Sequence, residues 1–64
     1  MSPKELLLLP ARWWKVSDGR WTAQVNGHQC VLTMNNFPEE PLYTATVDEK
    51  QIDLDDAPSQ WTFD

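Results

Sequence analysis

Cysteine is nearly absent from this chain: Cys30 is the only one, so no internal disulfide can form. Secreted domains of this size usually depend on several disulfides, and a chain without them is more typical of a reducing compartment. Long apolar runs are missing too, because the four leucines of residues 6–9 are too few for a signal-peptide core or a membrane span. We therefore expect a cytoplasmic protein with no membrane partner.

Positive charge is also scarce. Five Lys and Arg residues stand against ten Asp and Glu residues, which gives a net charge of −5. Proteins that bind nucleic acid neutralise phosphates with a basic surface, and binding to anionic membranes requires the same sign of charge. The composition therefore predicts no direct nucleic-acid partner. It leaves open a basic protein partner, or binding to a partner's site that normally holds nucleic acid.

With 64 residues, the chain is expected to form a single small domain, residues 1–64. So small a domain buries a limited share of its surface and needs large side chains in its core. Four tryptophans, two phenylalanines and one tyrosine supply them. Since an aromatic side chain buries roughly 150–250 Å², we expect most of the tryptophans in the core.

Glycine is rare, and both glycines follow a residue that favours turns, in Asp18-Gly19 and Asn26-Gly27. Flanked by alternating apolar and polar residues, each dipeptide predicts a β-hairpin with a type I′ turn. Beginning with a strand at 12–17, the two hairpins form a three-stranded meander with one apolar face. The predicted pairs are Val16 with Trp21, Trp14 with Ala23, Val25 with His28, Ala23 with Cys30 and Trp21 with Leu32.

The opposite face of this meander is polar except at Trp13 and Val31. Its polar members are Lys15, Arg20, Thr22, Gln24, Gln29 and Thr33. Trp13 is either covered, by the leucines of residues 6–9 or by Trp61 and Phe63, or exposed. If it is exposed, it forms an amphipathic patch with the basic residues around it, and Trp and Arg are enriched at binding hot spots.

Two further strands are predicted at 42–48 and 51–54, joined by a tight turn at Glu49-Lys50 that pairs Val47 with Ile52. Residues 61–63 alternate and are compatible with a short closing strand. The predicted fold is all-β, a small antiparallel meander of five or six strands. It is either open or closed into a barrel that resembles small SH3-like barrels in size and strand density, although no motif of that family is present.

The N-terminal segment allows two interpretations. Ser2, Pro3 and Glu5 match a capping box with Pro at the first helical position, which predicts a short helix that ends before Pro10. The alternative is an extended edge segment with Pro10 at a bulge.

His28 and Cys30 are two residues apart, so their side chains share one face of a strand. Two such residues are half of a zinc site, but no further histidine or cysteine is available to complete it. Cys30 is also expected opposite Ala23 in the core, where a thiol is unreactive because its pKa is raised. We predict no metal, no cofactor and no catalytic residue, and we do not expect an enzyme.

The acidic residues near the C-terminal end form a cluster in the sequence. Its members are Asp48, Glu49, Asp53, Asp55 and Asp56. They lack the order of a calcium-binding loop, so a solvated face or a charged strand edge is the expected role. The same carboxylates motivate the alternative function of an acidic inhibitor or nucleic-acid mimic, such as a phage- or toxin-associated antagonist.

The sequence favours a small non-enzymatic interaction or regulatory module that binds a protein partner through an aromatic and basic sheet face or a free sheet edge. The candidate surface consists of Trp13, Lys15, Arg20, Val31 and Phe37. Phe37 lies in a turn-rich loop at 35–41, where it either plugs one end of the core or anchors a partner. A binder of small ligands or carbohydrates is a further alternative, and a homodimer is compatible with the half-apolar outer face.

Overall fold

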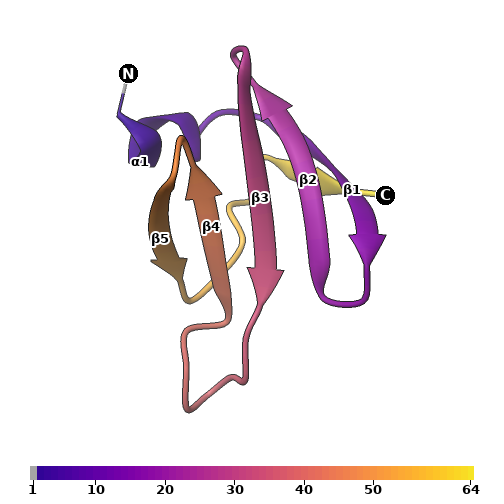
Figure 1. Ribbon diagram of the computed structural model, residues 1–64, viewed down its shortest axis with the longest axis vertical. Coiled ribbons are helices and arrows are strands. Elements are labelled where there is room, and N and C mark those ends of the chain that lie inside the picture. The colour runs from indigo at the N-terminus through magenta and orange to yellow at the C-terminus, as the bar shows by residue number, and fades with distance from the viewer. Residues whose placement is uncertain (1) are drawn as a thin grey trace.

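Six strands form one open sheet in the computed structural model, which describes residues 2–64. The strand order is β5-β4-β3-β2-β1-β6, so β1 to β5 form a meander and β6 returns beside β1. The elements are α1 (Pro3–Leu6), β1 (Ala11–Ser17), β2 (Arg20–Val25), β3 (His28–Met34), β4 (Tyr43–Val47), β5 (Lys50–Leu54) and β6 (Trp61–Phe63). Figure 1 shows the meander strands side by side, with β6 passing behind β2 and β3. The predicted all-β meander is confirmed, and within residues 2–64 the sheet is not closed.

The N-terminal helix forms because Ser2 caps it. The Ser2 hydroxyl accepts a hydrogen bond from the Glu5 backbone N–H at 3.2 Å, and Pro3 begins the helix. The extended alternative is therefore wrong, although α1 ends at Leu6 and continues only as a tight turn, in which the Leu9 N–H donates to the Leu6 carbonyl. No helix in residues 2–64 has the length and apolar character to cross a membrane.

The turn between β2 and β3 has the predicted type I′ geometry, because Asn26 and Gly27 both have positive φ values, 52° and 82°. The predicted pairs across it are confirmed, including Ala23 with Cys30. The turn between β1 and β2 differs, since its positive φ belongs to Gly19 and not to Asp18.

A β-bulge at Val16 changes the register of β1. Ser17 pairs with Arg20 across the turn, but Lys15 and not Val16 pairs with Trp21, so Val16 has no partner of its own. Every residue of β1 before the bulge consequently points to the face opposite the predicted one. The predicted pairs of Val16 with Trp21 and of Trp14 with Ala23 are therefore wrong.

The hairpin of β4 and β5 is confirmed, but its register differs by two residues from the prediction. Asp48 and Glu49 make the turn with φ values of 50° and 68°, so Val47 pairs with Lys50 instead of Ile52. A shift of two residues preserves the faces of both strands, because side chains alternate with a period of two. The turn forms without glycine, which is why its position was misplaced.

The core lies on the side of the sheet covered by α1 and β6. The adjacent tryptophans divide between the two sides: Trp13 is 0% exposed in the core, and Trp14 is 48% exposed on the opposite face. Trp61 of β6 packs on Trp13 with ring centroids 5.0 Å apart, and its indole N–H donates to the Leu7 carbonyl at 3.0 Å. Of the two alternatives predicted for Trp13, the covered one is therefore confirmed, and Trp61 is one of the residues that cover it. β6 runs parallel to β1, with Ala11 paired to Trp61. A strand at 61–63 was expected, but its partner strand was not.

Candidate interaction surface on the open face of the sheet

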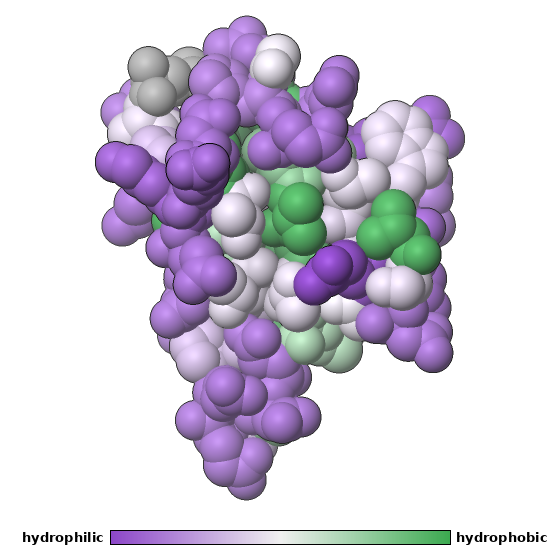
Figure 2. Space-filling model, viewed as in Figure 1, coloured by the Kyte–Doolittle hydropathy of each residue, from purple (hydrophilic) through white to green (hydrophobic). Residues whose placement is uncertain are grey.

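The side of the sheet that faces away from the core is uncovered, and we call it the open face. Figure 2, viewed as Figure 1, shows it as a pale band of intermediate hydropathy with green apolar areas and purple margins. In residues 2–64 none of its members is buried, and most are hydroxyl or amide side chains. They are Trp14, Arg20, Thr22, Gln24, Gln29, Val31, Thr33, Thr44, Thr46, Gln51 and Asp53.

Strand register aligns these side chains in two neighbouring rows that run across the strands. The row we call the valine row contains Trp14, Thr22, Val31, Thr46 and Gln51. The row we call the charged row contains Arg20, Thr33, Thr44 and Asp53. Because cross-strand pairs lie about 4.5–5.5 Å apart, each row forms a continuous strip of contacts.

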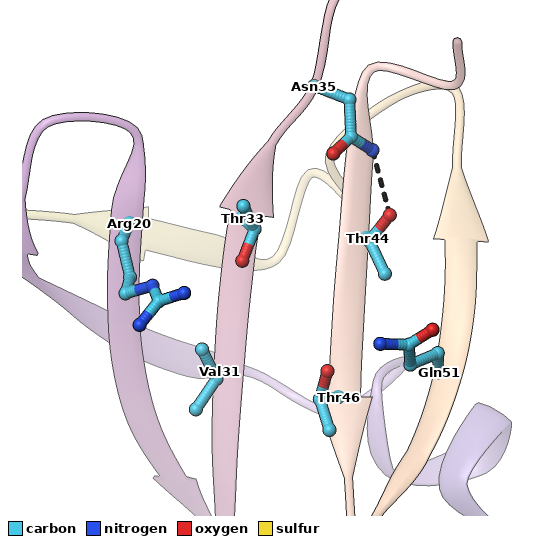
Figure 3. A pocket seen from close by; sticks show the side chains of 7 residues that line it. All are labelled: Arg20, Val31, Thr33, Asn35, Thr44, Thr46 and Gln51. Atoms are coloured by element: carbon cyan, nitrogen blue, oxygen red, sulfur yellow. Dashed lines mark hydrogen bonds between the residues drawn. The ribbon is translucent and has the colours of Figure 1, made fainter.

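The centre of the open face is hollowed. A depression of about 430 Å³ lies over β2 to β5, where short threonine and valine side chains are surrounded by longer ones. Its lining residues, drawn in Figure 3, are Arg20, Val31, Thr33, Asn35, Thr44, Thr46 and Gln51. Val31 supplies an apolar floor, and the other residues supply hydrogen-bonding groups around it.

One side of the hollow is held by a chain of hydrogen bonds. The Asn35 amide donates to the Thr44 hydroxyl at 2.7 Å and to the Pro41 carbonyl at 3.0 Å, and the Thr44 hydroxyl donates to Asp53 at 3.2 Å. This chain fixes the start of the 35–42 loop against β4 and orients the Asp53 carboxylate.

The opposite side of the hollow carries uncommitted groups. Within the described part of the chain, the Arg20 guanidinium has no carboxylate within ion-pair distance, and neither it nor the Thr33 and Thr46 hydroxyls donate a side-chain hydrogen bond. Figure 3 shows the Arg20 side chain directed from β2 toward β3. An unpaired guanidinium beside an apolar side chain is a combination suited to binding a carboxylate.

Trp14 extends the valine row to the edge of the open face. The Arg12 guanidinium lies 5.4 Å from the centre of the Trp14 ring and also contacts Asp64, with Nε 3.1 Å from the carboxylate. This cation–π contact holds the ring while leaving much of it accessible. Sequence reasoning missed Trp14 because the bulge at Val16 was not recognised, and no residue there signalled it.

The predicted surface residues do not all meet. Arg20 and Val31 share the hollow, but Trp13 is buried and cannot contact a partner, which corrects its placement on the surface. Lys15 points to the other face of the sheet, on which it is the cross-strand partner of Trp21, and its Nζ is 3.5 Å from the Asp18 carboxylate. Phe37 is 57% exposed in the 35–42 loop, outside the hollow, so it does not plug the core.

Cys30 and His28, the residues considered for metal binding and catalysis, do not line the hollow. Cys30 is buried, and this burial, with Asp48 as a second cause, raises the pKa of its thiol as expected for an inert core cysteine. His28 Nδ1 lies 2.7 Å from the Asp48 carboxylate and so joins the tips of two hairpins. In residues 2–64 no group of three or more histidine, cysteine or acidic side chains is placed to hold a metal ion.

Three residues of the acidic cluster of the sequence have partners of their own. Asp48 contacts His28, Asp53 accepts from Thr44, and Asp56 accepts from the Ala57 backbone N–H at 2.8 Å. Each of these three carboxylates therefore has a different partner.

No protein-family model, curated protein or solved structure matches the chain. The geometry of its own residues is therefore the basis on which a function can be inferred.

Proposed function

We propose that the protein is a small non-enzymatic interaction module that binds a partner protein through the open face of its sheet. The observation that carries this proposal is the hollow, in which the unpaired Arg20 guanidinium stands beside the apolar Val31. Arginine next to an apolar centre and ringed by hydrogen-bonding groups is a common composition of protein interfaces.

The lining of the hollow supports binding rather than catalysis. Its functional groups are hydroxyls, amides and one guanidinium. None of these residue types is an effective general base near neutral pH. The fitting partner presents a carboxylate to Arg20, a methyl or larger apolar group to Val31 and polar groups to the threonines.

This proposal is tested by crosslinking in the cells that make the protein. A photo-crosslinking residue replaces Gln51, which is exposed at the hollow, and in a matched variant it replaces Lys4, which is exposed on α1. We expect a discrete protein adduct from position 51 and none from position 4. Adding Arg20→Glu to the first variant is expected to remove the adduct while the circular dichroism spectrum is retained.

The opposite results are equally clear. Equal adducts from positions 51 and 4, or an adduct that survives Arg20→Glu, would place any contact elsewhere on the molecule. The absence of an adduct at position 51 in a folded, expressed protein would overturn binding through the open face.

Salt dependence separates this function from that of an acidic inhibitor. A partner held by one guanidinium and an apolar centre is expected to lose only modest affinity as salt rises, whereas a mimic that uses many carboxylates loses it steeply. Asp48, Asp53 and Asp56 each already contact a group of this chain, and this favours the first behaviour.

A small polar ligand with an anionic group is a second candidate, and the volume of the hollow favours it. About 430 Å³ falls within the range of small-molecule sites, roughly 300–1,000 Å³. Backbone amide shifts of Thr33 and Thr46 during titration with sugar acids and nucleotides would reveal such binding. Shifts confined to these strands would support a ligand site, and an unchanged spectrum would reject it.

A further inference from the structure

The two charges of the charged row lie at its opposite ends. Arg20 is on β2 and Asp53 is on β5, with Thr33 and Thr44 between them. Three strand spacings of about 4.8 Å separate the two ends by about 14 Å. Across the sheet the row therefore runs from a cation, through two hydroxyls, to an anion.

Such a row is complementary to itself. Consider a twofold axis that runs parallel to the strands, above the open face and midway between β3 and β4. A half-turn about this axis places a second sheet over the first and exchanges the two ends of the row, so Arg20 of one copy faces Asp53 of the other. The same rotation places Thr33 over Thr44, and in the neighbouring valine row it places Val31 over Thr46. Each contact is then made twice, as twofold symmetry requires.

The dimensions of the side chains agree with this arrangement. Two sheets that pack face to face lie about 10 Å apart with their strands within roughly 30° of each other. An extended arginine and an aspartate together span that gap, and the shorter threonines leave room for bridging water, which is common in interfaces. The exposed ring of Trp14, one strand beyond Arg20, then reaches the β5 edge of the second copy.

The distribution of charge also favours this face. The chain has a net charge of −5, so most approaches between two copies bring like charges together. On the open face, however, Arg20 and Asp53 balance each other. The open face is thus the part of the sheet on which two acidic molecules meet with complementary charge.

We propose that the open face binds a second copy of this chain, with Arg20 of each copy paired to Asp53 of the other. This inference rests on the proposed function, since it names the partner of the same surface. It makes the protein a twofold dimer with the two sheets stacked face to face.

Charge exchange tests the pairing in the purified full chain. Sedimentation equilibrium of the wild type is expected to show a dimer, and Arg20→Asp or Asp53→Arg alone is expected to raise its dissociation constant at least about tenfold, because each faces like charges. The double variant R20D/D53R restores opposite charges and is expected to return within about threefold of the wild type. Lys50→Asp and Glu39→Arg change the net charge equally away from the open face and serve as matched controls.

Each other result overturns the dimer. A wild type that stays monomeric at millimolar concentration, single variants that dimerise as well as their controls, or a double variant that is not rescued would each do so. Circular dichroism establishes that every variant is folded. Thr33→Arg adds bulk near the twofold axis and is expected to disrupt the dimer in a second way. If the purified protein is monomeric while position 51 still crosslinks to a different protein, the proposed function stands and this inference alone fails.

Discussion

Trp13 and Trp61 pack against each other with ring centroids 5.0 Å apart, and this contact joins the first strand to the last. The Trp61 indole N–H also donates to the Leu7 carbonyl at 3.0 Å. One side chain therefore connects β6, the end of the helical segment and β1. In a domain this small, where the core is limited, such a contact is expected to matter for stability.

Replacing Trp61 should separate its two contributions to stability. Trp61→Phe retains an aromatic ring but leaves the Leu7 carbonyl unpaired, so we expect a loss of about 1–3 kcal/mol in the free energy of unfolding. Trp61→Ala also removes the contact with Trp13 and should cost about 3–5 kcal/mol. Urea unfolding followed by circular dichroism measures both, and equal losses would contradict the role of the ring.

The adjacent tryptophans should respond differently to truncation. Trp13→Ala opens a cavity in the core and is expected to cost about 3–5 kcal/mol. Trp14→Ala removes a half-exposed ring and a cation–π contact, so we expect a cost of about 1 kcal/mol or less. Thermal unfolding of the two variants provides the comparison. A larger cost at Trp14 would show that β1 has the register predicted from the hairpin alone.

Deleting Val16 should be tolerated. Because Val16 has no partner in β2, its removal leaves Ser17 opposite Arg20 and Lys15 opposite Trp21 in a regular ladder. We expect the free energy of unfolding to change by less than about 1 kcal/mol, as is typical of changes at surface positions. The matched control is deletion of Thr46, which has a partner on each side and whose loss reverses the faces of half a strand. Unfolding of both deletion variants would be evidence against the bulge.

Stability should decline at alkaline pH because of Cys30. Its thiol has a raised pKa in the fold, first through burial and second through Asp48, so the unfolded chain releases this proton at lower pH than the folded chain does. The stabilisation is complete below the pKa of the unfolded thiol and is lost as pH rises through the higher pKa of the folded one. Urea unfolding at several pH values should show a steeper decline for the wild type than for Cys30→Ala. Parallel profiles for the two proteins would argue against the thiol as the cause.

Much of the fold follows from local signals in the sequence. Asn26-Gly27 determines a hairpin and its register, because two adjacent residues with positive φ are readily accommodated by that pair. Ser2, Pro3 and Glu5 determine where α1 begins. The period-two alternation of β4 and β5 predicted their faces correctly even though the turn was misplaced by one residue.

The candidate site was predicted only in part. Arg20 and Val31 were placed together on the polar face, and the structure brings them into one hollow. Trp13 was assigned to that face and Trp14 to the core, and the Val16 bulge reverses both. A bulge is selected by how the twisted strand packs on the rest of the core, and it left no mark in the residues around it.

The sequence by itself therefore determined the hairpins, the helix start and the alternation of faces, because each depends on the conformational preferences of a few neighbouring residues. Only the tertiary structure decided the bulge, the parallel pairing of β6 with β1 and the row that joins Arg20 to Asp53. These features depend on contacts between residues far apart in the chain, whose energies depend on the packing of the whole sheet.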